Sequence, residues 1–213
     1  MKIQHWCLMI AVLGQAACSL PQGGRQGMVI HDFKYPWSGN PPPRTSFEAV
    51  ISGDRWHFTF DVEDQDIVTS PVWTGESTLD DEDRVEIFFA RDPELGRYFC
   101  VEIDSLGRVH DYEAKFYRQF ESGWQCTGLV TSAERTSAGY RVKGSIPLVT
   151  LSDLLGKPVG AGTTVNMGVF RAEFRGRDKS SHGGANDNWI SWQLPRTKAP
   201  DFHVPSAFKH VKL

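Results

Sequence analysis

The sequence has few cysteines, no long hydrophobic run and almost no excess of charge of one sign. Its formal net charge is -3, so electrostatic attraction gives no reason to expect nucleic acid as a partner. The 4 cysteines form no CxxC pair and no Cys/His spacing typical of zinc. Apolar residues make up 40% and charged residues 23% of the 213 residues, which indicates one globular domain with a full core.

The start of the chain carries the pattern of an export signal. Lys2 gives a short positive region, residues 6–13 form an apolar run too short to span a bilayer permanently, and Ala16-Ala17 is a small-residue site. Cys18 follows directly, and Gln15-Ala16-Ala17-Cys18 resembles a bacterial lipoprotein cleavage box. We therefore expect a signal peptide over residues 1–18 and lipidation of Cys18. The alternative is an ordinary secretory signal cut nearby.

This start also predicts where the protein resides. The polar residues 19–27 would tether the domain of residues 28–213 to a membrane through the lipid on Cys18. We expect an exported protein, in the outer membrane or periplasm as a lipoprotein and otherwise secreted. Cys100 and Cys126 are the cysteines that remain in the domain, and export permits a disulfide between them. Two buried free thiols are the equal alternative.

Apolar and polar residues alternate with a period of two through most of the chain after residue 28. Trp56, Phe58, Phe60 and Val62 point to one side of a predicted strand. Further strands are predicted at residues 84–89, 98–104, 109–116, 124–132, 139–147, 165–174 and 189–193. Residues 149–155 are the one helical candidate. Short strands separated by turn signals favour an all-β fold, a single antiparallel β-sandwich.

Two stretches are predicted to be loops. Residues 35–44 are rich in proline, and residues 175–188 are rich in glycine, serine, asparagine and charge. Loops on a rigid sandwich often carry binding residues. The 7 tryptophans are many for this length, and we expect most of them to pack in the core.

Several motifs occur in an order that identifies a family. Residues 83–88 read Asp-Arg-Val-Glu-Ile-Phe, and residues 98–107 run from Tyr98 through Glu102 and Asp104 to Gly107. Ser191-Trp192 and the terminal stretch 202–208 follow. Together these motifs resemble family 9 carbohydrate-binding modules over nearly the whole domain. The resemblance implies a sandwich of the family 9 and DOMON-like type that binds sugar without altering it.

The resemblance also implies a sugar site. Characterised members clamp one sugar ring between two aromatics, which map onto Trp73 and Phe202, and Glu86 maps onto an acceptor of sugar hydroxyls. Three features depart from the family pattern: a longer stretch over residues 74–82, phenylalanine in place of tryptophan at Phe202, and Glu102 where some members have arginine. The alternative for Trp73 and Phe202 is that they cover the edge of the sandwich.

Charged residues complete the expected ligand-binding set. We expect Glu86, Glu102, Asp104 and Arg171 on one sheet face, where they would bind sugar hydroxyls through charge-assisted hydrogen bonds. The alternative is a structural ion-pair cluster in which Arg171 holds Glu86 or Glu102. The resemblance adds Trp192 and His203 from the two closing motifs to the set.

No cofactor is predicted, with structural calcium as the one possibility. Four acidic residues close in sequence could hold calcium, and a solvated acidic loop is the alternative reading: Asp61, Glu63, Asp64 and Asp66. Haem would need Met167 with a ligand such as His182, His203 or His210, and a methionine in a strand is usually core.

The sequence therefore predicts a non-catalytic carbohydrate-binding domain, for a sugar or the end of a polysaccharide chain. Its partners would be the carbohydrate, a membrane through Cys18 and enzymes of polysaccharide use. Two other functions stay open. One is a cell-surface structural or interaction domain without a sugar site. The other is a glycoside hydrolase, for which Glu86 and Glu102 form the one attractive carboxylate pair.

Overall fold

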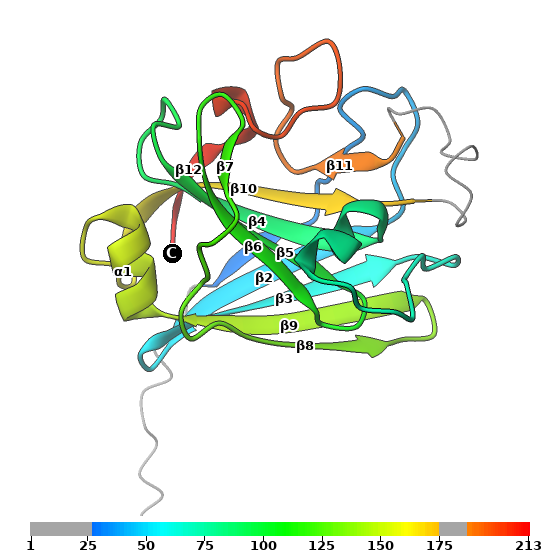
Figure 1. Cartoon of the computed structure of the whole chain (residues 1–213), viewed down its shortest axis with the longest axis horizontal. Coiled ribbons are helices and arrows are strands. Elements are labelled where there is room, and N and C mark those ends of the chain that lie inside the picture. Colours follow the sequence, from blue (N-terminus) through cyan, green and yellow to red (C-terminus); the bar gives the residue numbers. More distant parts are fainter. Residues whose placement is uncertain (1–26, 175–186) are drawn as a thin grey trace, which may run out of the picture.

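The computed structural model describes residues 27–174 and 187–213, which form an antiparallel β-sandwich of two sheets (Figure 1). The single all-β domain that the alternation predicted is confirmed. The smaller sheet has 5 strands in the order β1-β2-β3-β9-β8. These strands are β1 (Met28–Ile30), β2 (Thr45–Ser52), β3 (Arg55–Glu63), β8 (Val130–Arg135) and β9 (Gly139–Pro147).

The larger sheet has 7 strands, in the order β11-β10-β4-β5-β6-β7 with β12 also paired to β10. They are β4 (Arg84–Ala90), β5 (Tyr98–Asp104), β6 (Val109–Lys115), β7 (Gln119–Glu121), β10 (Thr164–Ala172), β11 (Trp189–Ser191) and β12 (Lys209–Lys212). In the central pair β4–β5, Glu86 lies opposite Glu102, and Arg84 lies opposite Asp104. This register places the charged residues of both strands on the same face.

Within residues 27–174 and 187–213, three short helices connect the strands. They are the 3-10 helices η1 (Glu76–Asp81) and η3 (Pro205–Ala207) and the α-helix α1 (Leu148–Leu155), which lies at one end of the sandwich in Figure 1. The helix predicted at residues 149–155 is confirmed. It ends at Gly156, whose φ of 64° is left-handed and therefore favours glycine at this position.

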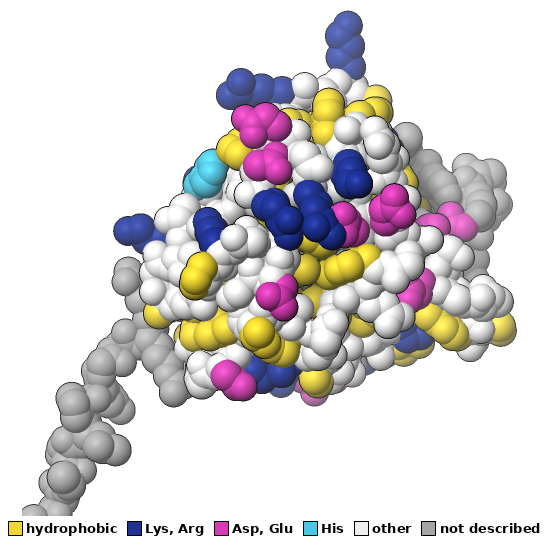
Figure 2. All heavy atoms as spheres, turned by 60° about the vertical axis from the view of Figure 1, so that its left-hand side comes forward, with side chains coloured by type: hydrophobic (Ala, Val, Ile, Leu, Met, Phe, Trp, Pro, Cys, Tyr) yellow, Lys and Arg dark blue, Asp and Glu magenta, His cyan; other side chains and the backbone are white. Residues whose placement is uncertain are grey.

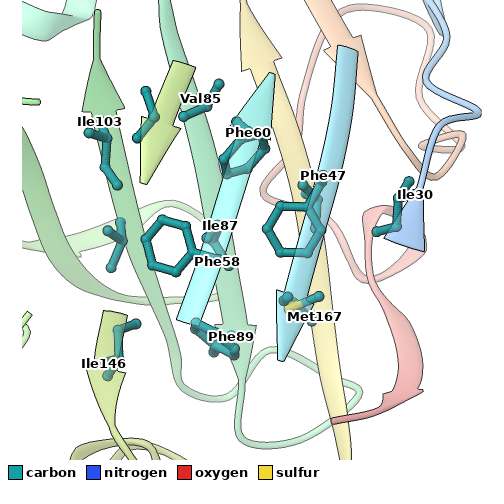
Figure 3. Close-up of a cluster of buried hydrophobic side chains, with 14 of the residues drawn as sticks. Ile30, Phe47, Phe58, Phe60, Val85, Ile87, Phe89, Ile103, Ile146 and Met167 are labelled. Atoms are coloured by element: carbon teal, nitrogen blue, oxygen red, sulfur yellow. The ribbon is translucent and has the colours of Figure 1, made fainter. Parts of the chain in front are cut away.

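The main core fills the space between the two sheets (Figure 3). Phe58 and Phe60 of the smaller sheet pack there against Val85, Ile87 and Phe89 of the larger one. The alternation that predicted these inward positions is therefore confirmed. Every residue of β4 and β5 is buried, however, including those that point outward. The outer face of the larger sheet must therefore be covered.

A second apolar cluster forms that cover. Phe88 and Tyr98 on the outer face of β4 and β5 pack with Phe170 of β10 and with Phe202 and Phe208 from the end of the chain. The segment between β11 and β12 lies on the side of the larger sheet away from the smaller one (Figure 1). The terminal motif therefore folds back over the sheet and leaves a hollow between its residues and the charged positions of β4 and β5.

Two expectations about residues 100–132 are settled by the structure. The prediction of a strand at residues 124–132 is wrong. Residues 127–128 form a turn in which Gly128 has a φ of 73°, and the strand begins only at Val130. Cys100 and Cys126 are free and buried. Cys100 lies in the outer cluster and Cys126 in the core between the sheets, so the sheet separates the two thiols.

The surface of the described part mixes side-chain types. On the face in Figure 2, acidic and basic side chains lie among hydrophobic ones without a large patch of one sign. Among residues 27–174 and 187–213, no helix has the length and hydrophobicity to cross a membrane. Cys18, His182, the predicted signal peptide and all but one residue of the predicted tether lie outside the described residues.

Candidate functional site

A cavity of about 380 Å³ opens on the outer face of the larger sheet. Strands β4, β5 and β6 form its floor, and its walls come from η1, the β6–β7 hairpin, β11 and the residues before η3. The lining residues are Asp80, Arg84, Glu86, Glu102, His110, Tyr112, Arg118, Phe120, Ser122, Trp189, Pro200, Asp201, Phe202 and His203. Segments far apart in sequence thus meet here because the chain end folds back over the sheet.

A buried charge cluster forms the floor. Nε of Arg84 lies 2.6 Å from Oε2 of Glu102 and 3.1 Å from Oε1 of Glu86. The Tyr112 hydroxyl donates a 2.7 Å hydrogen bond to the other oxygen of Glu102. One guanidinium thus lies beside two carboxyl groups. Burial and then the negative charge of Glu102 raise the pKa of Glu86 to about 8, so Glu86 holds a proton at neutral pH.

Asp80 and His110 face each other at one side of the cavity. His110 Nδ1 lies 3.3 Å from Asp80 Oδ1. The hydrogen bond with His110 lowers the pKa of Asp80. Burial disfavours the charged form of the His110 ring, but the hydrogen bond with Asp80 outweighs this effect, so the pKa of His110 is raised. Ligand atoms of Asp80, Glu102 and His110 lie within 4.8 Å of one another, which a metal ion could bridge. The charge of Glu102 is, however, already neutralised by Arg84 without a metal ion.

Aromatic rings form the walls. Phe202 is only 5% exposed, because one face stacks on Phe170 with ring centroids 4.2 Å apart, and Trp37 packs at 5.7 Å. Phe202 therefore has little free ring face. Trp189, which meets Phe202 edge-on, is partly exposed, and Phe120 is 46% exposed. These two residues offer the more exposed aromatic surfaces of the cavity, with the Arg84 guanidinium 5.7 Å from the Trp189 ring centroid and the Arg118 guanidinium 5.4 Å from the Phe120 ring centroid.

His203 fixes the terminal segment to the sheet. Its Nδ1 shares a 3.1 Å hydrogen bond with the Tyr98 hydroxyl, and its backbone N–H donates to Asp201 Oδ1 at 2.9 Å. Burial lowers the pKa of His203 to about 3, so the ring is neutral at physiological pH. Phe120 packs edge-on against the same ring at 5.1 Å. His203 thus joins the hairpin and the chain end at the cavity wall.

Half of the predicted ligand-binding set lines this cavity. Glu86, Glu102, Phe202 and His203 do, and that they bind a sugar stays a prediction. The structure does not bring Trp73 to the cavity lining. Its indole is 45% exposed, and the Arg108 guanidinium lies 5.2 Å from the ring centroid.

Asp104 and Trp192 also lie outside the lining. Asp104 is fully buried and accepts hydrogen bonds from the backbone N–H groups of Leu106 and Arg108 and from the Arg108 side chain. It therefore closes the β5–β6 turn. Trp192 packs against the main core, with the Lys209 ammonium 5.2 Å from its ring.

The expectation that Arg171 shares a face with Glu86 is wrong. In the β10–β4 register Arg171 lies opposite Val85, and Phe170 lies opposite Glu86, so the guanidinium points between the sheets. There Arg171 is fully buried, pairs with Glu173 and donates to the Thr45 hydroxyl at 3.1 Å. Arg84 holds both glutamates instead, and the predicted structural ion-pair cluster exists with a different arginine.

Sequence reasoning missed several lining residues. Arg84 alternates in phase with Glu86, so the strand pattern already placed it on the same face. The pairing of His110 with Glu102 and of Tyr112 with Cys100 depends on the β5–β6 register, which the turn at Gly107 sets. Nothing in the sequence indicated that residues 118–122 would reach across to the chain end.

The four calcium candidates do not form one site. Asp61 pairs with Arg141 at 2.6 Å, and Glu63 pairs with Arg44 at 3.7 Å. Asp64 lies 3.8 Å from the buried Arg171, and an Asp64 oxygen accepts the backbone N–H of Asp66. Glu63, Asp64 and Asp66 line a second hollow, and Asp61 is absent from its lining.

The fold and cavity define a β-sandwich of the binding-module class. The family model described as "Carbohydrate family 9 binding domain-like" matches residues 29–213. The chain therefore belongs to this family, as the motifs predicted, and its domain is a non-catalytic binding module. No curated protein matches the chain significantly.

Solved structures share the fold at low identity. A Bacteroides uniformis protein to which carbohydrate binding is ascribed has 17% identity and a TM-score of 0.64, covering 89% of this chain and 86% of its own. A family 9 module from Caldicellulosiruptor kristjanssonii in complex with glucose has 14% identity and a TM-score of 0.53, and the match covers 85% of this chain and 83% of the module. The same kind of module with cellotriose has 14% identity and a TM-score of 0.52, with 86% and 80% covered.

Proposed function

We propose that the protein binds a carbohydrate, as a sugar or as the end of a polysaccharide chain, in the cavity on the larger sheet. The observation that carries the proposal is the combination of hydrogen-bonding carboxyl groups at the floor with accessible aromatic faces at the walls. Glu86 and Glu102 supply the first, and Phe120 and Trp189 supply the second. A sugar ring presents hydroxyls around its edge and an apolar C–H face, which match these two surfaces.

The polar floor suits hydroxyl groups because it offers both donors and acceptors. A sugar hydroxyl can donate one hydrogen bond and accept others. Glu102 is an acceptor held in place by Arg84 and Tyr112, and Glu86 at neutral pH carries a proton that it can donate. Because the carboxyl groups are positioned before binding, little side-chain order is lost when a ligand enters. The volume of about 380 Å³ is at the small end for ligand pockets and suits one ring.

The experiment is a calorimetric titration of the purified protein with glucose, cellotriose and a panel of other sugars. Phe120→Ala, which removes a half-exposed ring, and Glu86→Leu, which removes the hydrogen-bonding carboxyl group, should each weaken binding by about tenfold, the size of one aromatic or hydrogen-bonding contact. Trp73→Ala is the matched comparison, because this indole lies outside the cavity lining. It should bind like the wild type.

The outcomes distinguish a sugar site in the cavity, a sugar site at the Trp73 loop and a domain that binds no sugar. Loss of binding in Trp73→Ala alone would move the sugar site to the Trp73 loop, where the family resemblance predicted one half of the clamp. No binding of any sugar by a folded protein would contradict the proposal and favour a structural or interaction domain.

We further propose that the domain acts outside the cytoplasm, anchored to a membrane by a lipid on Cys18. Support comes from the export pattern of residues 1–18 and the cleavage-box pattern that ends at Cys18. A lipid anchor would hold the binding site near surface enzymes of polysaccharide use. Expression of the full chain in a bacterium fed labelled palmitate tests this. The wild type should be labelled, and Cys18→Ala should not; labelling of both or of neither would contradict the anchor.

A further inference from the structure

We propose that the β6–β7 hairpin carries a second carbohydrate subsite, which binds the next ring of an oligosaccharide whose first ring occupies the cavity. The inference rests on the proposed function and narrows it. The ligand class becomes a glycan chain instead of a free monosaccharide. The subsite consists of the rings of Phe116 and Tyr117 at the tip of the hairpin.

This hairpin has three exposed aromatic side chains within five residues, two at its tip and one in β7. Phe116 is 48% exposed, Tyr117 is 53% exposed, and Phe120 is 46% exposed. The first two rings lie edge to face with centroids 5.4 Å apart. Large aromatics held in solvent lose hydrophobic stabilisation that burial would give, so a group of them usually marks a binding surface.

This aromatic group continues the wall of the cavity. Phe120 and Arg118 line the cavity, and Tyr117 and Phe116 precede them directly in the chain. The Tyr117 hydroxyl donates a 2.6 Å hydrogen bond to Asp201, which is itself a lining residue. A chain that leaves the cavity over Asp201 therefore meets the rings of Tyr117 and Phe116 next.

The hairpin is held in a fixed position. Arg118 pairs with Asp201 at 3.1 Å, so Asp201 receives two side-chain contacts from neighbouring hairpin residues. The Phe116 backbone N–H donates to the Leu95 carbonyl oxygen at 2.9 Å, and the strands pair from Glu113 opposite Glu121 to Lys115 opposite Gln119. Rings positioned in this way can stack on a ligand without a large ordering cost.

A sugar chain fits this surface better than a protein partner does. The charges at the rim, Arg118 and Asp201, already neutralise each other. Three rings are also few beside the roughly 20–30 residues per side of a stable protein interface. Flat rings next to hydrogen-bonding groups, in line with a cavity of single-ring size, match successive pyranose units.

The test compares matched pairs of a monosaccharide and its trisaccharide by calorimetry: glucose with cellotriose, xylose with xylotriose, and mannose with mannotriose. In the best-binding pair, the wild type should bind the trisaccharide about tenfold more tightly, as expected for one added aromatic contact. Phe116→Ala should abolish that advantage while affinity for the monosaccharide stays the same. Phe116→Tyr restores a flat ring and should restore the advantage. Val130→Ala, an exposed aliphatic position on the other sheet, is the control.

Failure of the subsite and failure of the proposed function give different results. If the monosaccharide binds and the trisaccharide binds no more tightly, the subsite is overturned and the sugar cavity stands. An advantage of the trisaccharide that survives in Phe116→Ala also overturns the subsite. If no sugar of any length binds, both proposals are overturned together.

Discussion

Arg84 and Glu102 form a buried ion pair across the β4–β5 register, with 2.6 Å between Nε and Oε2. The same guanidinium lies 3.1 Å from Glu86, so one positive charge holds two carboxyl groups on the cavity floor. Buried charges are tolerated when they are paired, and removing one partner leaves the others uncompensated. The stability of the domain and the shape of the cavity floor therefore depend on the same arginine.

We expect Arg84→Met to destabilise the domain by about 3–5 kcal/mol, because two buried carboxyl groups lose their partner. Urea denaturation followed by circular dichroism measures this. Arg141→Met is the matched control, since Arg141 pairs with Asp61 on the surface and should change the midpoint little. Equal midpoints for the two variants would show that the Arg84 pair contributes no stability.

Stability should fall as pH rises from about 6.5 to about 8. Burial and neighbouring negative charge raise the pKa of Glu86 to about 8, and burial raises the pKa of Asp83 to about 8. The folded state therefore binds protons that the unfolded state releases near pH 4 to 4.5, and the stabilisation is lost as pH rises through the folded pKa. Burial lowers the pKa of His203 from 6.5 to about 3. This residue therefore makes stability rise with pH, but only below pH 6.5.

The measurement is the melting temperature at several pH values between 6.5 and 8.5. Glu86→Gln removes one titrating group and should flatten the decrease without abolishing it, because Asp83 remains. A melting temperature that rises with pH in the wild type over this interval would contradict the predicted protonation of both residues.

Gly168→Ala should destabilise the domain by about 1–3 kcal/mol, the usual cost of overpacking. A Cβ at Gly168 would collide with the Phe170 ring and lie 3.1 Å from the Ala207 carbonyl oxygen. Phe170 supports Phe202, so the same change should also weaken sugar binding. Gly160→Ala is the control, since a Cβ there meets nothing within 4 Å. Chemical denaturation compares the two, and equal stability would contradict the tight packing.

Cys100 and Cys126 should resist alkylation in the folded protein. Both thiols are buried, and desolvation raises their pKa well above the usual range for Cys100 and to about 12 for Cys126. The thiolate, which is the reactive form, is therefore scarce. Iodoacetamide labelling before and after unfolding, mapped to peptides by mass spectrometry, checks this. We expect labelling of both only after unfolding. A disulfide-linked peptide would contradict the free thiols.

Much of the sandwich could be predicted because its signals are local. Alternation along β3 and β4 identifies strands with a buried face, and Gly156 after an apolar turn marks the end of α1. The strand predicted at 124–132 shows the limit, because the half-buried Trp124 packs on Phe99 and the buried Cys126 joins the main core without lying in a strand.

The candidate site was predictable where motif and strand phase agree, and not elsewhere. Glu86 and Glu102 follow from the motif and the alternation. Arg171 does not, because a fully buried arginine on the inner face breaks the rule that charges point outward. The distance of Trp73 from the cavity lining depends on the path of the residues that follow it, including η1, which local pattern does not specify.

The sequence by itself determined the fold class, the family and the inner faces of the strands, because residue periodicity and motif order are properties of neighbours in the chain. Only the tertiary structure decided which residues enclose the cavity. Arg84, Phe120 and Trp189 meet there because the β6–β7 hairpin and the chain end both fold over the outer face of the larger sheet. Such long-range contacts arise from packing between distant segments, and no local pattern encodes them.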